Sequence, residues 1–275
     1  MKTLLPFLFA AVAATALAAQ SHTLVKRWET PATLKVPESV LYDGARGVLF
    51  VTNIDGEPWG EDGKGSVGKV GLDGQIIATD WVTGLSAPKG MGLQGNRLYV
   101  ADIDRVVVID IERGAIAEKI PIAGAHGLND VVAAPDGTVY VSDSKDKKIY
   151  ALKDGKASLA VEGLKAVNGV YVRDGRLHFL DNGSLYRLGA QGAKELVSAG
   201  PEGNGDGLES VGDGEWVITY WQGLIQLAKA DGTRETLIDT SADKINSADL
   251  GFNPKERVIY VPTFFKNSIV AYELK

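Results

Sequence analysis

The sequence predicts an all-β protein, a six-bladed β-propeller whose last blade is closed by the N-terminal strand. Six polar residues recur along the chain, each about ten residues ahead of a short hydrophobic strand, at intervals of 38 to 51 residues. Such a period, built from short strands, is typical of propeller blades. The strands are β-branched and aromatic and are separated by DG, NG and GD turns, which argues against helical repeats. The six, called the ring residues below, are Glu38, Lys89, Asn129, Asn168, Asp206 and Asp249.

The repeat around Asn129 shows the plan of one blade. We expect strands at 130–134, 138–142, 148–152 and 156–161, with hairpin turns at PDG and KDG. The chain contains 33 glycines, which suits a turn-rich protein because glycine readily adopts the positive φ of tight hairpins.

The sixth repeat has three strands before the chain ends, so its blade lacks an outer strand. The strand-like segment SHTLVKRWETPATLKV at 21–36 precedes the first full repeat, and we expect it to complete the sixth blade and cover its edge. The alternative is an ordinary loose N-terminal segment.

Residues 1–18 are typical of a signal peptide, with Lys2, an apolar run and the small-residue site Ala16-Leu17-Ala18. We therefore expect an exported protein, periplasmic or secreted, in which residues 19–275 form a single propeller domain. No second segment approaches the roughly 20 apolar residues that cross a bilayer, so no membrane attachment is expected. The absence of cysteine excludes disulfides, thiolate metal sites and cysteine nucleophiles.

The charge pattern bears on the partners. The chain has 29 basic and 35 acidic residues and no basic run, so we expect neither nucleic acid nor anionic lipid as a partner. The run GKGSVG at 63–68 matches GxGxxG but opens a predicted strand, and PWGEDGKG at 58–65 lacks the first glycine of a P-loop. A nucleotide ligand is therefore not expected either.

The ring residues begin the inner strands and should converge near the propeller axis. Glu38, Asp206 and Asp249 bring three negative charges and Lys89 one positive charge, so a divalent cation would make the ring neutral. Carboxylates and amides, with no Cys and no His in the ring, suit Ca²⁺ first, or Mg²⁺ or Mn²⁺, rather than Zn²⁺. The competing interpretation is that Asp and Asn only cap turn amides, but capping gives no reason for Lys or Glu at equivalent positions.

The predicted pairing places six second-strand residues on the face that holds the ring, and the loops after them carry aromatic residues. A polar floor with an aromatic wall predicts a pocket for a small-molecule substrate or ligand, although each aromatic residue alone is better explained by packing between loops. The second-strand residues are Asn53, Asp102, Asp143, Asp181, Tyr220 and Thr263. The aromatic residues are Trp59, within the long insertion 54–66, and Trp221, Phe264 and Phe265.

Four segments in order carry a resemblance: Glu38 at the first inner strand, LND at 128–130, VNG at 167–169 and GDG at 205–207. Over the whole predicted mature chain they resemble the SMP-30/gluconolactonase/LRE-like family of six-bladed propellers, whose best-described members are calcium- or zinc-dependent lactonases and related ester hydrolases. The resemblance implies Glu38, Asn168 and Asp206 as metal ligands, Asn129 as a substrate or metal contact, and Asp206 also as general base. Two departures are Ser39-Val40 in place of Gly-Pro, and Gly127 where many lactonases have a basic residue.

Two functions remain open from the sequence. The first is a metal-dependent hydrolase of a lactone or ester, with Asp206 and Asn129 catalytic, or less favourably Asp249 as base. Its metal ligands would be Glu38, Asn168, Asp206 and Asp249, and its substrate contacts Lys89, Trp221 and His126. For His126, packing within its loop is the alternative. The second function is an exported propeller that binds a small molecule without catalysis and uses the metal for structure.

Overall fold

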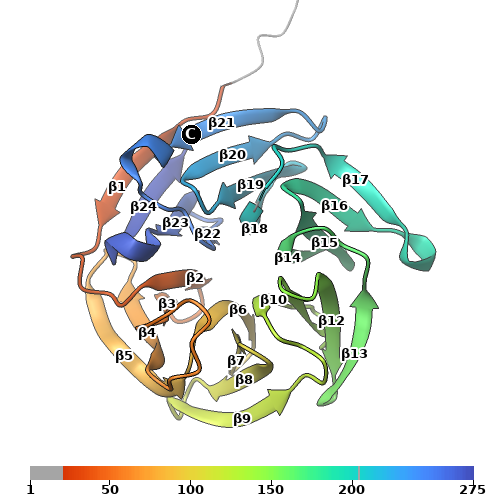
Figure 1. The fold of residues 1–275 in the computed structure, drawn as a ribbon. Helices are drawn as coiled ribbons and strands as arrows, with labels where there is room; N and C mark the ends of the chain where they lie inside the picture. Colours follow the sequence, from red (N-terminus) through yellow and green to blue (C-terminus); the bar gives the residue numbers. More distant parts are fainter. Residues whose placement is uncertain (1–20, 204) are drawn as a thin grey trace, which may run out of the picture.

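The structure is a computed structural model, and it describes residues 21–203 and 205–275. Within these residues the strands form six four-stranded antiparallel sheets, or blades, arranged around a central axis (Figure 1). The predicted all-β six-bladed propeller is confirmed. The predicted signal peptide, residues 1–18, lies outside the described residues.

Each of the first five blades runs along the chain from its inner to its outer strand. Blade 1 contains β2 (Pro37–Asp43), β3 (Val48–Asn53), β4 (Gly65–Gly71) and β5 (Ile76–Leu85). Blade 2 contains β6 (Pro88–Gln94), β7 (Arg97–Asp102), β8 (Arg105–Asp110) and β9 (Ala115–Pro121). Blade 3 contains β10 (Leu128–Ala133), β11 (Val139–Asp143), β12 (Lys148–Lys153) and β13 (Lys156–Val161).

The second half of the ring repeats the plan until the last blade. Blade 4 contains β14 (Val167–Arg173), β15 (Arg176–Asp181), β16 (Ser184–Leu188) and β17 (Lys194–Ser198). Blade 5 contains β18 (Gly205–Gly212), β19 (Glu215–Tyr220), β20 (Leu224–Ala228) and β21 (Arg234–Asp239). Blade 6 contains β22 (Gly251–Asn253), β23 (Val258–Pro262), β24 (Ile269–Leu274) and the N-terminal β1 (Leu24–Glu29).

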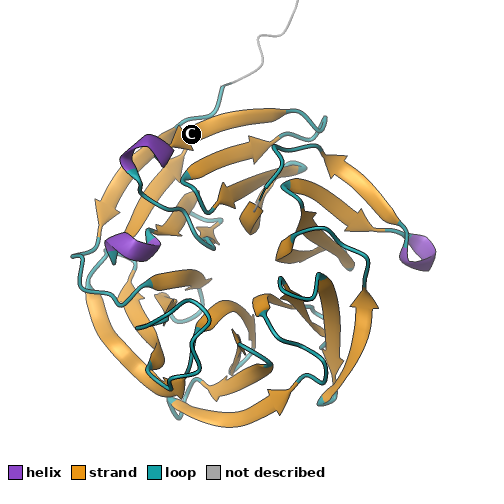
Figure 2. Cartoon of the chain, viewed as in Figure 1, coloured by secondary structure: helices purple, strands orange, loops and turns teal. Residues whose placement is uncertain are grey.

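The loops contain short 3₁₀ turns, drawn as coils in Figure 2. They are η1 (Ala190–Gly192), η2 (Ser241–Asp243) and η3 (Phe264–Lys266). The four strands predicted for blade 3 each end within two residues of the observed bounds. The glycine-rich run at 63–68 opens β4 and no helix, as predicted.

The N-terminal strand closes the ring as predicted. β1 pairs antiparallel with β24, from Leu24 opposite Leu274 to Glu29 opposite Val270. Trp28 in β1 also donates its indole N–H to the carbonyl of Leu72 in blade 1 at 2.9 Å, and its ring lies 5.7 Å from that of Tyr260 in blade 6. The strand thus ties the last blade to the first.

The hydrophobic core lies between neighbouring blades. Phe50 of blade 1 and Leu98 of blade 2, for example, are fully buried in one cluster, and Ile149 of blade 3 packs with Phe179 of blade 4 in another. Packing of every blade against the next fixes the inner strands around the axis. No helix of the described residues is long and apolar enough to cross a membrane.

A β-bulge sits at the start of five inner strands and determines where the ring residues point. In blade 1, Pro37 is opposite Asn53 but the next pair is Val40 with Val51, so Glu38 and Ser39 share one partner. In blades 2 to 5 the register between the first two strands shifts in the same way after their first residue pair. A bulge re-aims the side chains at its position, and here it places the ring residue at the mouth of the channel.

Hydroxyl groups satisfy backbone N–H groups that three of these bulges free from the strand ladder. Ser39 N–H donates to Thr52 Oγ1 at 2.9 Å, and Asp130 N–H donates to Ser142 Oγ at the same distance. Gly207 N–H donates to Thr219 Oγ1 at 2.8 Å. Because a buried amide without a partner costs stability, these hydroxyls hold the bulges in place.

Candidate functional site

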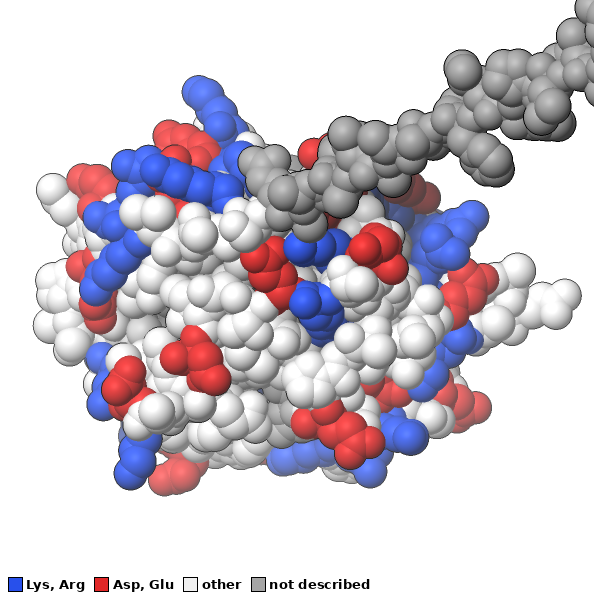
Figure 3. Space-filling model, turned by 90° about the horizontal axis from the view of Figure 1, so that it is seen from above, with Lys and Arg blue, Asp and Glu red and all other residues white. Residues whose placement is uncertain are grey.

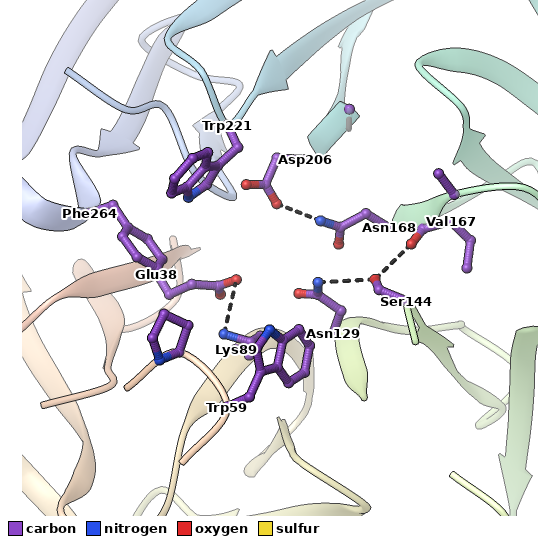
Figure 4. Close-up of a pocket in the computed structure, with 13 residues that line it drawn as sticks. Glu38, Trp59, Lys89, Asn129, Ser144, Val167, Asn168, Asp206, Trp221 and Phe264 are labelled. Carbon is purple, nitrogen blue, oxygen red and sulfur yellow. Dashed lines mark hydrogen bonds and ion pairs between the residues drawn. The ribbon is translucent and has the colours of Figure 1, made fainter. Parts of the chain in front are cut away.

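Five of the six ring residues meet at one cavity of about 290 Å³, at the end of the channel where the inner strands begin. Figure 4 shows Glu38, Lys89, Asn129, Asn168 and Asp206 converging on it from five blades. The predicted polar floor and aromatic wall are both present. Further lining residues are Pro58, Trp59, Ser144, Trp221 and Phe264.

Hydrogen bonds orient the two ring amides. Asn129 donates its amide N–H to Ser144 Oγ at 3.0 Å, and Ser144 donates its own hydroxyl proton to the carbonyl of Val167 at 2.7 Å. Asn168 donates to Asp206 Oδ1 at 2.7 Å. Both amide nitrogens are therefore engaged, which leaves the two carbonyl oxygens directed into the cavity (Figure 4).

Glu38 and Lys89 form a buried, loosely paired couple. Their side chains are almost inaccessible, and Lys89 Nζ lies 3.9 Å from Glu38 Oε1, too far for a hydrogen bond. Glu38 Oε2 is buried and has no hydrogen-bond partner among the described residues. Burial raises the pKa of Glu38 well above its usual value; Lys89 opposes this shift, and the carboxylates of Asp206 and Asp249 add to it.

Burial also shifts the pKa values of Asp206 and Lys89, the other two charged residues at the cavity. It raises the pKa of Asp206 to about 7, with a further rise from Asp249 and an opposing effect from Lys89 and the Asn168 hydrogen bond. Burial lowers the pKa of Lys89, against the attraction of Glu38 and Asp206. A carboxylate that changes protonation near neutral pH is suited to general base catalysis.

Asp249, the sixth ring residue, lines a different cavity of about 250 Å³, farther along the inner strands. Its Oδ2 accepts a hydrogen bond of 2.5 Å from Ser39 Oγ, and its backbone N–H donates to the carbonyl of Glu38 at 3.0 Å. Burial raises its pKa to about 7. Asp249 thus acts on the first cavity through its charge, and its direct coordination of a metal stays a prediction.

His126 lies outside the cavity wall. Its side chain is 70% exposed and its ring Nδ1 lies 2.6 Å from Asp146 Oδ2. The backbone N–H of His126 donates to Asp143 Oδ2 at 3.0 Å, which fixes the loop while the side chain stays in solvent. His126 is not among the residues that line the cavity, and its role in substrate binding stays a prediction.

Three acids at the ends of second strands, on the same face as the ring residues, accept hydrogen bonds from backbone N–H groups of loops. Asp102 accepts the backbone N–H groups of Ser86 and Ala87, and Asp181 accepts those of Lys165 and Ala166. Asp143 accepts the N–H groups of His126, Lys145 and Asp146. Turn capping, the alternative considered for the ring, therefore applies to these neighbouring acids.

The aromatic wall has two sides. Trp221 packs edge-on against Phe264 and Phe265, with ring centroids 5.7 and 6.2 Å away. Phe265 is 55% exposed and is not among the residues that line the cavity. On the other side, Trp59 packs against a buried cluster that includes Ile54 and Ile103, and Lys89 Nζ lies 4.6 Å from the centre of its ring.

Ser144 is a site residue that the sequence analysis missed. It fixes Asn129 and touches the cavity, and its hydroxyl type and its place directly after Asp143 were the available signals. Because Ser144 contacts Asn129 across a strand pair and Val167 across blades, the fold was needed to identify it.

The donor set of the first cavity fits a hard cation. Within the part of the chain that the structure describes, no group of three or more His, Cys, Asp or Glu side chains is arranged to hold a metal ion. The cavity instead offers two amide carbonyls that face inward and two carboxylates, one of which includes Glu38 Oε2, an atom with no hydrogen-bond partner among the described residues. Oxygen donors of this kind suit Ca²⁺ or Mg²⁺.

No family model matches the chain, and no curated protein sequence matches it. By contrast, 1204 solved chains match in structure, so the architecture is widespread and by itself assigns no function.

Three of the similar solved structures indicate the range of this architecture. A streptogramin B lyase is 14% identical with a TM-score of 0.66, covering 92% of this chain and 98% of its own. A protein described as a "putative gluconolactonase" is 19% identical with a TM-score of 0.68, covering 94% and 93%. A protein of unknown function from Bacteroides thetaiotaomicron is 13% identical with a TM-score of 0.67, covering 94% and 77%. At these identities the likeness establishes the shared fold.

Proposed function

We propose that the protein is a divalent-metal-dependent hydrolase of a lactone or related ester, of the SMP-30/gluconolactonase/LRE-like kind. The observation that carries this proposal is the convergence of Glu38, Asn129, Asn168 and Asp206 on one cavity, with Glu38 Oε2 buried and lacking a partner among the described residues. The likeness to a structure described as a gluconolactonase supports the same reaction class.

Oxygen atoms of Glu38, Asn168 and Asp206 would hold the ion, with Asn129 beside them, and Ca²⁺ is the first candidate. A bound divalent cation would polarise the substrate carbonyl and stabilise the developing oxyanion. Hydrogen bonds to Ser144 and Asp206 keep the two amide oxygens facing inward before any ligand arrives. Such preorganisation reduces the cost of binding.

Asp206 is the proposed general base. Its carboxylate takes a proton from water while the water oxygen adds to the ester carbonyl carbon. When the ring C–O bond breaks, the leaving oxygen receives that proton, and the product is a hydroxy acid. Trp221 on the wall and Lys89 on the floor would position the substrate. No covalent enzyme intermediate is required.

A second candidate function rests on Lys89. Its buried ammonium group already lies beside Glu38 and compensates part of the negative charge of the cavity. In a propeller that binds a small molecule without catalysis, Lys89 could balance the charge of the cavity without a catalytic metal. Any bound metal would then only stabilise the fold.

The proposal predicts loss of activity on metal removal. The purified protein is assayed against a panel of lactones and aryl esters before and after treatment with a chelator, with the metal content measured in parallel. We expect hydrolysis of at least one lactone, loss of that activity with chelator, and recovery on addition of Ca²⁺. A folded, metal-loaded protein that hydrolyses no member of the panel would favour the binding propeller.

A further inference from the structure

Lys145 lies on the loop between β11 and β12, directly after Ser144, which lines the first cavity. Its Nζ lies 4.6 Å from the centre of the Trp59 ring, the same distance as Lys89 Nζ. Two ammonium groups from different blades therefore contact one indole of the cavity wall. Lys89 is buried and Lys145 is exposed, so one lies on the floor and the other at the rim.

The position of Lys145 is built into the fold. Its aliphatic stem covers Gly127, where an added Cβ would lie only 2.5 Å from Lys145 Cγ, so the stem needs a glycine there. Asp143 Oδ1 accepts the backbone N–H of Lys145 at 3.1 Å and fixes the loop. Trp59 provides a face that attracts cations.

The two positive charges near Trp59 are poorly compensated by neighbouring acids. Among residues 21–203 and 205–275 the ammonium group of Lys145 forms no ion pair, while Lys89 has only the loose contact with Glu38. In the metal-loaded site, the carboxylates of Glu38 and Asp206 would balance a divalent cation. With Asp249 in the neighbouring cavity offsetting Lys89, Lys145 adds a positive charge that the ring residues do not balance.

We propose that Lys89 and Lys145 bind an anionic group of the substrate, and that the substrate is a lactone that carries a carboxylate. This inference rests on the proposed function and adds the substrate class. The carboxylate would lie beside Trp59 between the two ammonium groups, with the lactone carbonyl toward Asn129, Asn168 and Asp206. Hydrolysis adds water across the ring ester bond and yields a hydroxy dicarboxylate, without any redox step.

The test compares two lactones of the same ring size that differ in charge: D-glucaro-1,4-lactone, which carries a carboxylate, and D-glucono-1,4-lactone, which does not. For the metal-loaded protein we expect kcat/KM to be at least about tenfold higher for the carboxylate-bearing lactone, the scale of one charge-assisted contact. In Lys145→Met, which keeps the side-chain length, this ratio falls toward one; in Lys145→Arg it is retained.

Lys156→Met is the matched control, because Lys156 is an exposed lysine on the outer strand of the same blade and its loss changes the net charge equally. This variant is expected to keep the wild-type ratio. A wild-type ratio near one, or an unchanged ratio in Lys145→Met, overturns the inference while the hydrolase proposal stands.

A binding measurement separates the two proposals if neither lactone is hydrolysed. The D-glucarate dianion is titrated into wild type and Lys145→Met by calorimetry. Binding to wild type that weakens at least about fivefold in the variant supports the anion site even though the hydrolase proposal has failed. No binding to wild type, or equal binding to both proteins, overturns the anion site.

Discussion

Each ring residue owes its direction to a small set of neighbours. The bulge at Glu38 and Ser39 turns Glu38 into the channel, and the hydroxyl of Thr52 satisfies the freed amide of Ser39. Because no group in residues 21–203 and 205–275 donates a hydrogen bond to Glu38 Oε2, the ionised carboxylate has a high free energy in this site. A cation in the cavity would relieve this cost.

Replacing Glu38 by glutamine tests the role of this carboxylate. Burial raises the pKa of Glu38 well above its usual value, so in the metal-free protein the neutral glutamine side chain resembles the protonated acid and should leave thermal stability nearly unchanged. We expect Ca²⁺ affinity, measured by calorimetric titration, to fall about tenfold or more, because ligand charge sets affinity at such sites.

Glu61→Gln is the control for Glu38→Gln, since Glu61 is an exposed residue of the same blade. It should bind Ca²⁺ like wild type. Equal Ca²⁺ affinity in Glu38→Gln and wild type would remove Glu38 from the metal site.

The buried acids predict an unusual pH dependence of stability in the chelator-treated protein. The pKa values of Asp206 and Asp249 are raised to about 7, so between about pH 4 and 7 the folded state holds protons that the unfolded state has lost. Stability should therefore fall as the pH rises through this window. His178, whose pKa burial lowers to about 4, acts in the opposite direction below about pH 6.5 and offsets one of the two.

Melting temperatures at pH 5 and pH 7.5 measure this dependence. The wild-type protein without metal should melt at a lower temperature at pH 7.5, and the double variant Asp206→Asn/Asp249→Asn should show a smaller decline, because two of the groups that take up protons on folding are gone while the other buried acids remain. The same change in melting temperature between the two pH values in wild type and in the double variant would show that the two aspartates are not protonated in the folded state.

At the scale of elements, β1 is the strand on which ring closure depends. It forms the outer edge of blade 6, and Trp28 within it contacts Leu72 of blade 1. Deletion of residues 21–30 would expose the edge of β24 and remove the link between the first and last blades. We expect the deleted protein to lose its cooperative thermal transition, followed by circular dichroism.

A point variant gives a milder form of the same test. Trp28→Ala should lower the free energy of unfolding by about 3 kcal/mol through lost packing, whereas Val25→Ala, at an exposed position on the same strand, should have little effect. Unchanged urea unfolding of Trp28→Ala would contradict the role given to β1 in closure.

Local signals were sufficient to predict the elements. Alternating hydrophobic strands and PDG or KDG turns gave the strands of blade 3 to within two residues, because hairpins depend on adjacent residues. The bulges, however, depend on contacts with the partner strand and could not be predicted from local signals. The regular spacing of the ring residues predicted that Glu38 and Asp249 would share a site. The structure instead places Asp249 at a second cavity, deeper along the axis.

Site residues that are brought together by long-range contacts could not be predicted from the sequence. Ser144 lines the cavity and Lys145 contacts Trp59 on its wall, because blade 3 lies beside the insertion that carries Trp59 and is far from it in the chain. His126 is close to Asn129 in sequence, yet its loop directs the side chain to solvent. Spacing along the chain predicts neighbours within a hairpin better than neighbours across blades.

At the scale of the whole molecule, the ring concentrates acids along its axis and spreads the other charges outside. The face in Figure 3 shows acidic and basic side chains interspersed. Inside, the first cavity contains Glu38 and Asp206, and the second contains Asp130, Glu209 and Asp249, whose pKa values are all raised by burial. A cation bound in the channel would favour the ionised forms of these acids, which burial otherwise disfavours.

The fold gathers the acids around the channel, and the proposed chemistry depends on one of them, the carboxylate of Asp206. The most direct measurement is lactone turnover by metal-loaded Asp206→Asn, with bound metal quantified in the same sample and Asp213→Asn, an exposed residue at the far end of the same hairpin, as control. We predict that Asp206→Asn keeps a bound ion and loses about 100-fold or more in kcat, while the control matches wild type. Wild-type turnover by Asp206→Asn would contradict the proposed mechanism.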